Sequence, residues 1–167
     1  SIKDFKVSKA NINRSLLNTV WPARMQNIKG KLARLAGEKF DIWLDGGHNL
    51  DASNVINNII DSWEEKKIVV ILGMINGKDP INFLRKIIDK ISLLILLPIN
   101  EHQYVMPYQI KSDVLEKFKP DFNINCCISI DEAIKVTKCE IPNGKILICG
   151  SLYLAGEVLK SDGYKIK

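Results

Sequence analysis

The chain has 167 residues, of which 46% are hydrophobic and 26% are charged, and its formal net charge is +5. This length is enough for one well-buried core, and no apolar run approaches the roughly 20 residues that span a bilayer, which argues against a membrane protein. The lysines are spread along the chain without a basic stripe and interleaved aromatics. We therefore expect no nucleic-acid partner, and the positive charge favours small anionic ligands.

The first 20 residues are polar and rich in lysine, with a weak helical stripe at Ile12, Leu16 and Val20. They predict a hinge or connecting segment over residues 1–20, followed by one domain over residues 21–167. The segment has neither an initiating Met nor an apolar core of the signal-peptide type. We therefore interpret the chain as part of a longer protein.

Apolar runs predict strands at 40–45, 67–74, 93–98, 145–150 and, from a weaker pattern, 122–128. These runs are nearly continuous in hydrophobicity and do not alternate with polar residues. That pattern is typical of parallel strands covered on both faces.

Between these runs, apolar residues recur at helical spacing. The stripes predict helices from about Ala52 to Trp63, from Pro80 to Ile91 with Asp79 as N-cap, and over 107–118, 131–137 and 151–160. Strands that alternate with helices across short loops indicate a doubly wound α/β fold. We expect a Rossmann-like, mostly parallel sheet of about five or six strands with helices on both faces.

The four cysteines, Cys126, Cys127, Cys139 and Cys149, include no CxxC pair. A disulfide between the neighbours Cys126 and Cys127 would be strained. We expect all four to be reduced core residues of a cytoplasmic protein, with no structural zinc site.

The polar residues of the chain gather in the loops that follow the predicted strands. These loops are "DGGHN" (45–49), "GMINGKDP" (73–80), "PINEHQY" (98–104) and "GSLYLAG" (150–156). Ligands of an open parallel sheet bind outside the carboxyl ends of its strands. We therefore expect the functional site in these loops.

The stretch "LGMINGKDP" (72–80) resembles a phosphate-binding loop without being one. It is one residue short of GxxxxGK[ST], and Asp79 stands where a hydroxyl is needed. We interpret it as a turn at Gly77 and a helix cap at Asp79, with Lys78 exposed.

"LDGGHN" (44–49) predicts a ligand site. Asp45 at a strand tip is placed to accept hydrogen bonds from a diol such as a ribose, and Gly46 and Gly47 allow a ligand close to the backbone. The following helix points free N–H groups at the same space, and His48 adds a donor or a switchable charge. The alternative is that Asp45 or Asn49 only caps that helix while His48 is an ordinary loop residue.

Two further residues are candidates. Arg24, after the Trp-Pro turn of "TVWPARMQ" (19–26), suits bidentate phosphate binding, although a surface salt bridge is the default explanation of this residue taken alone. Ser151 stands where a hydroxyl and a helix N-terminus hold a carboxylate, or where a serine simply caps the helix. His102 has no second ligand at metal spacing, and we assign Tyr153 to packing.

Taken together, "WPAR" (21–24), "LDGGHN" (44–49), "GMINGKDP" (73–80) and "GSLYLAGEVL" (150–159) resemble one family. Their order and content are similar to the carboxy-terminal domain of bifunctional folylpolyglutamate synthase/dihydrofolate synthase, a branch of the Mur ligase superfamily. The resemblance extends over residues 12–159.

The resemblance implies an acid–amino-acid ligase that uses ATP and Mg²⁺ to join L-glutamate to dihydropteroate or folate through an acyl phosphate. It implies catalytic roles for Arg24 and His48, and ATP binding by Arg24, Asp45 and Asn49. It further implies that His48 and Ser151 contact glutamate. The implied protein is a cytoplasmic monomer, with no metal ligands among these residues.

The chain departs from the family in two small exchanges and one large absence. Ala23 stands where the family commonly has glycine, and Gly47 where it has alanine; both exchanges keep a small residue. The P-loop, the Mg²⁺ ligands, most of the folate pocket and a modified lysine belong to the family's amino-terminal ATPase domain, which this sequence does not contain. We therefore expect this chain to need that domain as its partner and to be inactive alone.

Two alternatives remain at this point. One is the carboxy-terminal domain of a cell-wall Mur ligase, against which "GSLYLAGEVL" argues because it resembles the folate branch. The other is a stand-alone nucleotide-binding module. A GTNGKGS-like loop upstream of Ser1 would favour the ligase.

Overall fold

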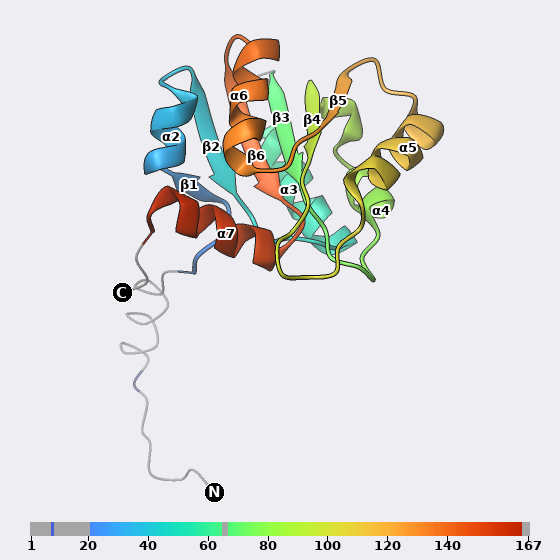
Figure 1. Cartoon of the computed structure of the whole chain (residues 1–167), viewed down its shortest axis with the longest axis horizontal. Helices are drawn as coiled ribbons and strands as arrows, with labels where there is room; N and C mark the ends of the chain where they lie inside the picture. Colours follow the sequence, from blue (N-terminus) through green and yellow to red (C-terminus); the bar gives the residue numbers. More distant parts are fainter. Residues whose placement is uncertain (1–7, 9–20, 65–66, 165–167) are drawn as a thin grey trace, which may run out of the picture.

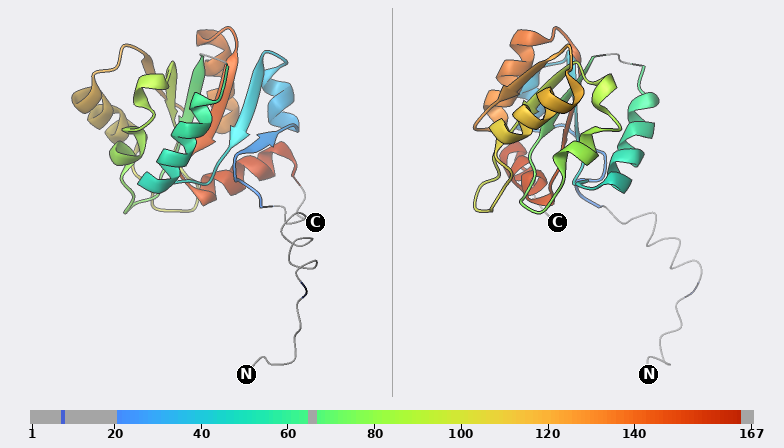
Figure 2. Two further views of the ribbon diagram at one scale, coloured as in Figure 1. Left: turned by 180° about the vertical axis from the view of Figure 1, so that it is seen from behind. Right: turned by 90° about the vertical axis from the view of Figure 1, so that its right-hand side faces the viewer.

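The computed structural model describes residue 8, residues 21–64 and residues 67–164. They form a six-stranded sheet with helices on both faces (Figures 1 and 2). The strands are β1 (Gln26–Ile28), β2 (Phe40–Leu44), β3 (Ile68–Leu72), β4 (Leu93–Leu96), β5 (Asn123–Cys126) and β6 (Gly144–Cys149). The helices are α2 (Lys31–Ala36), α3 (Leu50–Asp61), α4 (Pro80–Leu84), α5 (Pro107–Phe118), α6 (Ile130–Glu140) and α7 (Leu152–Asp162), with a 3₁₀ turn η1 (Ile88–Lys90).

The sheet has the strand order β1-β2-β6-β3-β4-β5. β1 runs antiparallel to β2, and all other neighbours are parallel. The predicted doubly wound, mostly parallel α/β fold is therefore confirmed.

Helices cover the two faces of the sheet in separate groups. Apolar residues of α2, α6 and α7 pack on one face, and those of α3, α4 and α5 pack on the other. The right-hand view of Figure 2 shows the sheet between these two layers. The central strands are buried on both faces, since every residue of β3 and β4 is buried, which explains their continuous apolar sequence.

The topology indicates where a ligand crevice is expected. β2 and β6 are parallel neighbours, but the chain leaves β2 toward α3 on one face and leaves β6 toward α7 on the other. Loops that diverge from adjacent strand ends open a crevice between them, which is the topological switch point of such sheets. This topology places the expected ligand crevice at residues 45–49 and residues 150–151.

The structure confirms the five predicted strands and adds β1 and α2, which the sequence analysis missed. β1 has only three residues, too few for a periodic signal. α2 begins after Gly30, which has no side chain to cap it. The cap comes from Asp162 at the end of α7, whose carboxylate accepts from Gly30 N at 3.0 Å and from Leu32 N at 2.8 Å.

Three predicted helices match closely and two differ in length. α3, α5 and α7 agree with their predictions. The helix predicted for residues 80–91 ends at Leu84 and continues as turns with i→i+3 hydrogen bonds, such as Ile87 N to Leu84 O. α6 is longer than predicted, by one residue at its start and three at its end. Ser129 caps its start, with Ser129 Oγ accepting from Glu132 N, and the Glu132 carboxylate accepts from Ile128 N.

Other predictions meet the structure less completely. The hinge segment and its helical stripe lie, except for Ser8, outside the described residues. All four cysteines are free, as predicted, but Cys126 and Cys139 are exposed and are therefore not core residues. Among the described residues, no helix has the length and apolar character needed to cross a bilayer.

Candidate functional site

Arg24 lies in a turn with an unusual backbone. Ala23 has φ 56° and Met25 has φ 41°, so two residues with side chains adopt left-handed conformations on either side of Arg24. Such a conformation costs a non-glycine residue about 1–2 kcal/mol, so the surrounding contacts must stabilise it. The Arg24 side chain is exposed, with its guanidinium carbon 6.0 Å from the centre of the Trp21 ring.

Asp45, directly after β2, supplies the principal contact to this turn. One carboxylate oxygen accepts from Met25 N at 2.9 Å, and the other accepts from Gly47 N at 2.7 Å. Gly46 N donates in turn to Ala23 O at 2.8 Å. Asp45 does not cap α3 and is 7% exposed, so in this structure its carboxylate joins the Arg24 turn to the 45–49 loop.

The two glycines of this loop serve packing between protein segments. A Cβ on Gly46 would lie 2.2 Å from Leu152 Cδ2, and one on Gly47 would lie 2.7 Å from both Ala52 Cβ and Asp45 Oδ1. The expectation that the missing side chains of Gly46 and Gly47 leave room for a ligand is therefore wrong, because protein atoms fill that space. The glycines instead let α3, α7 and the Asp45 carboxylate approach closely.

His48 and Asn49 follow at the start of α3. Asn49 caps the helix, since its Oδ1 accepts from Ala52 N at 2.9 Å. His48 is half-buried, and its Nδ1 lies 3.1 Å from Gly46 O. A carbonyl only accepts, so Nδ1 carries the proton in this contact and the neutral ring has its acceptor at Nε2. Asp51, in the first turn of α3, reduces the attraction of this helix end for anions.

The end of β6 contacts the 45–49 loop. Gly150 has φ 106° and donates its N–H to Gly47 O at 2.9 Å. Ser151 is 3% exposed and caps α7, with its Oγ accepting from Tyr153 N at 3.1 Å. α7 has no acidic residue in its first turn, so its N-terminus suits an anion better than that of α3.

Electrostatics at this edge also involve Cys149, the last residue of β6. Burial raises the pKa of its thiol, and the negative charge of Asp45 raises it further. Cys149 is therefore a neutral packing residue beside the crevice and not a nucleophile.

The loops after β3 and β4 lie next to each other at the same edge of the sheet. Asn76 N donates to Gln103 O and Val105 N donates to Met74 O. As predicted, Gly77 turns the chain, with φ 82°, and Asp79 caps α4; Lys78 is half-buried and not fully exposed.

Tyr153 is half exposed and stacks against His102, with ring centroids 3.7 Å apart. This contact brings α7 beside the loop after β4. Tyr153 therefore packs, as predicted, but its ring contacts His102 at the surface of the protein.

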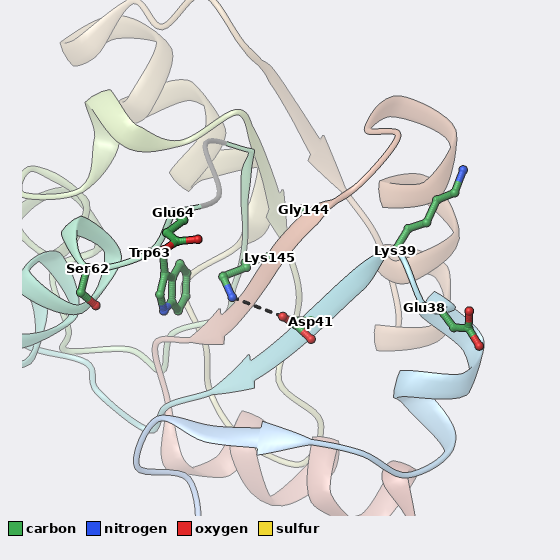
Figure 3. A pocket seen from close by; sticks show the side chains of 8 residues that line it. All are labelled: Glu38, Lys39, Asp41, Ser62, Trp63, Glu64, Gly144 and Lys145. Carbon is green, nitrogen blue, oxygen red and sulfur yellow. Dashed lines mark hydrogen bonds and ion pairs between the residues drawn. The ribbon is translucent and has the colours of Figure 1, made fainter.

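At the amino ends of the strands, opposite the candidate site, lies a hollow of about 530 Å³ (Figure 3). At its centre, Lys145 Nζ lies 3.2 Å from Asp41 Oδ2 and 5.4 Å from the centre of the Trp63 ring. Trp43 lies behind Trp63 with ring centroids 6.0 Å apart, and its Nε1 is buried without a hydrogen-bond partner. None of the residues predicted for the site lines this hollow, which is formed by Glu38, Lys39, Asp41, Ser62, Trp63, Glu64, Gly144 and Lys145.

Within the described ranges, no group of three or more His, Cys, Asp or Glu side chains is arranged to hold a metal ion. The crevice residues therefore do not fit a metal centre of their own. A divalent ion at this edge would depend on ligands from outside these residues.

The structure thus brings Arg24, Asp45, His48, Asn49 and Ser151 to one edge, through contacts between three loops. Sequence reasoning missed Met25 and Gln26, whose backbone and side chain shape the Arg24 turn. Gln26 Oε1 accepts from Ala23 N at 3.0 Å. The only sequence signal for this arrangement was the quoted stretch "WPARMQ" itself, in which no residue type marks a left-handed turn.

Comparison with known proteins identifies relatives of this chain. A family model described as the C-terminal domain of dihydrofolate synthetase matches residues 27–161. The chain is also 26% identical over 155 residues to folylpolyglutamate synthase of Lacticaseibacillus casei, a match that covers 93% of this chain and 33% of that protein. The chain therefore spans about a third of the length of this relative.

Solved structures share the fold at lower identity. A Mycobacterium tuberculosis folylpolyglutamate synthase complexed with ADP and AMPPCP matches 97% of this chain and 37% of its own, with 15% identity and a TM-score of 0.79. A bifunctional folylpolyglutamate synthase/dihydrofolate synthase with Mn, AMPPNP and L-glutamate bound matches 95% of this chain and 36% of its own, with 17% identity and a TM-score of 0.71. Escherichia coli FolC in complex with DHPP and ADP gives a TM-score of 0.71 at 17% identity, over 95% of this chain and 35% of its own.

Proposed function

We propose that this chain, which belongs to the family of dihydrofolate synthetase C-terminal domains, supplies half of the active site of an ATP-dependent ligase. The complete protein would join L-glutamate to the carboxylate of dihydropteroate, of folate or of both. The observation that carries this proposal is the hydrogen-bonded junction of the three loops around the crevice, above all Met25 N to Asp45 Oδ2 at 2.9 Å. It fixes the backbone around the exposed Arg24 side chain against the loop that precedes α3.

The reaction has two steps with different demands on the site. The substrate carboxylate first attacks the γ-phosphorus of ATP, forming an acyl phosphate and releasing ADP. The glutamate amine then attacks the acyl carbon, the C–O bond to phosphate breaks, and phosphate leaves as the amide forms. The first step builds negative charge on the transferring phosphoryl group, and the second needs an amine that has lost its proton.

Arg24 suits the first step. Its side chain is exposed while its backbone is fixed from both sides, so the guanidinium can clamp phosphate oxygens with little ordering cost. We assign ATP phosphate binding and charge stabilisation to Arg24. Asp45 and Asn49 would form the nucleotide side of the crevice, with Asp45 meeting the ribose only through lone pairs that its two backbone contacts leave free.

His48 and Ser151 suit the second step. The contact of His48 Nδ1 with Gly46 O leaves Nε2 as the acceptor of the neutral ring, so this atom can take the proton that the glutamate ammonium must lose. Ser151 at the N-terminus of α7, which lacks an acidic residue in its first turn, can help hold a glutamate carboxylate. Both residues follow strands that lie side by side.

The remaining parts would come from elsewhere in the complete protein. The relatives are about three times as long as this chain, and we propose that an amino-terminal ATPase domain provides the triphosphate cradle, the Mg²⁺ ligands and most of the folate pocket. We further propose a monomeric cytoplasmic enzyme, in which the four free cysteines stay reduced.

An isotope experiment tests the reaction on the complete protein. With ATP, L-glutamate and dihydropteroate labelled with ¹⁸O in its carboxylate, one labelled oxygen should appear in phosphate for each amide formed. Labelled substrate without glutamate controls for simple hydrolysis. Amide formation with unlabelled phosphate would contradict the acyl-phosphate route.

A second measurement tests the division of the site between two domains. The 167-residue chain alone should release no phosphate above background under the same conditions. Robust turnover by the chain alone would overturn the proposed dependence on another domain.

A further inference from the structure

We propose that Gln26 and Asp45 are positioning residues that hold Arg24 in a preset left-handed turn, with Gln26 fixing the residue before Arg24 and Asp45 the residue after it. The proposal rests on the proposed contact of Arg24 with ATP phosphates. It adds a residue, Gln26, that has no role of its own in binding ATP or glutamate, and it changes the main task of Asp45 from ligand contact to support.

Two side-chain acceptors hold the two strained residues. Gln26 Oε1 accepts from Ala23 N at 3.0 Å, and Asp45 Oδ2 accepts from Met25 N at 2.9 Å. Ala23 and Met25 are the two residues beside Arg24, and both have positive φ. Each strained residue therefore has its N–H fixed by a side chain, while the N–H of Arg24 lies between them.

The sheet register places both acceptors next to each other. Gln26 is the first residue of β1 and lies opposite Leu44, the last residue of β2. Asp45 follows Leu44 directly. The two acceptors therefore leave neighbouring strand ends, so the antiparallel pairing of β1 with β2 sets their spacing before any ligand is present.

The turn is closed by its own carbonyl. Ala23 O accepts from Gly46 N at 2.8 Å, and the Ala23 side chain is 3% exposed. The same Asp45 carboxylate also accepts from Gly47 N at 2.7 Å, and Gly47 O accepts from Gly150 N at 2.9 Å. A displacement of the Arg24 turn would therefore disturb the loop that carries His48 and the end of β6.

The arrangement separates fixed from free parts. The backbone on both sides of Arg24 is bound, whereas its side chain is exposed, with the guanidinium carbon 6.0 Å from the centre of the Trp21 ring. A guanidinium that approaches a phosphoryl group from a fixed backbone loses less freedom on binding than one on a mobile loop. Strain at a residue beside a functional group, held by surrounding contacts, is the usual form of such support.

The first test measures the turn itself, in the 167-residue chain and without any substrate. In backbone ¹⁵N–¹H spectra, Gln26→Leu should shift and broaden the signals of Ala23, Arg24 and Met25 and move the Trp21 indole signal, leaving those of β3 and β4 in place. Gln26→Ser, too short to reach Ala23, gives the same readout if leucine is not tolerated. Native positions for the Ala23 and Arg24 signals in these variants would overturn the proposal.

Two matched variants control this test. Gln26→Glu keeps an acceptor oxygen at the same distance along the side chain and should retain the native signals. Asn27→Ala removes the neighbouring amide side chain of β1, which donates to Ile42 O at 3.4 Å and not to the turn, and should also leave the turn unchanged. Equal effects from Asn27→Ala and Gln26→Leu would reduce Gln26 to a general stabiliser of β1 and contradict the proposal.

The second test uses ligase turnover by the complete protein. Losing the fixed position should lower kcat/KM for ATP roughly tenfold to hundredfold in Gln26→Leu, with Gln26→Glu close to the unmodified protein. In an Arg24→Ala background, Gln26→Leu should cost little more, because the group it positions is gone. A full additional loss in that background would contradict positioning.

The two tests also separate this proposal from the proposed function. If Arg24→Ala leaves turnover unchanged, the phosphate role of Arg24 fails even where the spectra show that Gln26 holds the turn. If Arg24→Ala lowers turnover while Gln26→Leu neither moves the turn nor slows the reaction, the proposed function stands and the positioning role fails.

Discussion

The two ends of β2 each carry an aspartate, and they differ in what they do. Asp41 near the start of the strand has a side chain that is 64% exposed and pairs with Lys145 beside the hollow of Figure 3. Asp45, just past the other end, is 7% exposed and accepts two backbone N–H groups from different segments. The exposed aspartate borders the hollow, whereas the buried carboxylate joins the Arg24 turn to the 45–49 loop.

This difference shows that the two ends of the strands are built in different ways. The hollow is formed at the amino ends of the strands by charged side chains that reach solvent. At the carboxyl ends, backbone contacts join the loops that leave adjacent strands, at the topological switch point of the sheet. Each of the following predictions compares a substitution at one position with a control substitution elsewhere in the chain.

The largest effect is expected for Arg24→Ala in the complete protein. Removing one preorganised donor from a charged transition state typically costs about 2.7–4 kcal/mol, so kcat/KM should fall by about two to three orders of magnitude, at about 1.4 kcal/mol for each tenfold. Lys145→Ala, which removes a cation from the hollow, should leave turnover unchanged. Steady-state kinetics with varied ATP measure both, and the reverse result would make the hollow the functional site.

The substitutions Asp45→Ala and Asp41→Ala compare how much the aspartates at the two ends of β2 contribute to stability. Asp45→Ala leaves Met25 N and Gly47 N without their acceptor, and we expect a loss of about 2–4 kcal/mol in the free energy of unfolding. Asp41→Ala breaks an exposed ion pair and should cost less than about 1 kcal/mol. Urea denaturation of the 167-residue chain measures the difference, and equal losses would show that Asp45 does not tie the loops.

Gly47→Ala tests how tightly the loops pack, because a new Cβ would lie 2.7 Å from Ala52 Cβ and from Asp45 Oδ1. We expect a destabilisation of about 1–3 kcal/mol. Gly156, inside α7 with open space around it, is the control, and Gly156→Ala should stabilise by about 0.5–1 kcal/mol. Thermal unfolding distinguishes the two signs; stabilisation by alanine at position 47 would mean that the loops are not closely packed there.

The smallest expected effect concerns the thiols. Burial, then Glu132 and other nearby groups, raises the pKa of Cys127 from 9.0 to about 11. The folded state therefore binds the Cys127 thiol proton more tightly than the unfolded state does. The resulting contribution to the free energy of unfolding is complete below pH 9 and is lost as the pH rises toward 11. The unfolding free energy of Cys127→Ala should fall less steeply across this window than that of Cys139→Ala, in which an exposed thiol is removed.

Thiol labelling at pH 8 provides the matching kinetic measurement. Cys126 and Cys139 should react with a thiol reagent in the folded chain, while the buried Cys127 and Cys149 should react only after unfolding. Rapid labelling of Cys149 in the folded chain would mean that the end of β6 is open to solvent.

Much of the fold is predictable from the sequence because burial leaves a strong pattern. β3 and β4 are buried throughout and read as continuous apolar runs, and α5 begins at Pro107, where a proline favours the first helical turn. α2 is different, since Asp162 caps it from 130 residues or more away. No local signal announces a cap that comes from the other end of the chain.

The candidate site divides in the same way. That Asp45, His48 and Ser151 meet at one edge follows from their places after adjacent strands. The hydrogen bond from Met25 N to Asp45 could not be predicted from the sequence. It depends on the left-handed conformations of Ala23 and Met25. No residue type in the sequence indicates a left-handed conformation at Ala23 or Met25. At Gly77 the glycine itself indicates a turn.

The three tryptophans test the central claim most directly, because Trp21 lies beside Arg24 while Trp43 and Trp63 lie at the hollow. In the complete protein labelled with 5-fluorotryptophan, ¹⁹F signals are assigned by single Trp→Phe substitutions. AMPPNP with Mg²⁺ should shift the Trp21 signal and leave the Trp43 and Trp63 signals in place. A shift of Trp63 with an unmoved Trp21 would contradict the account and place the nucleotide at the opposite edge of the sheet.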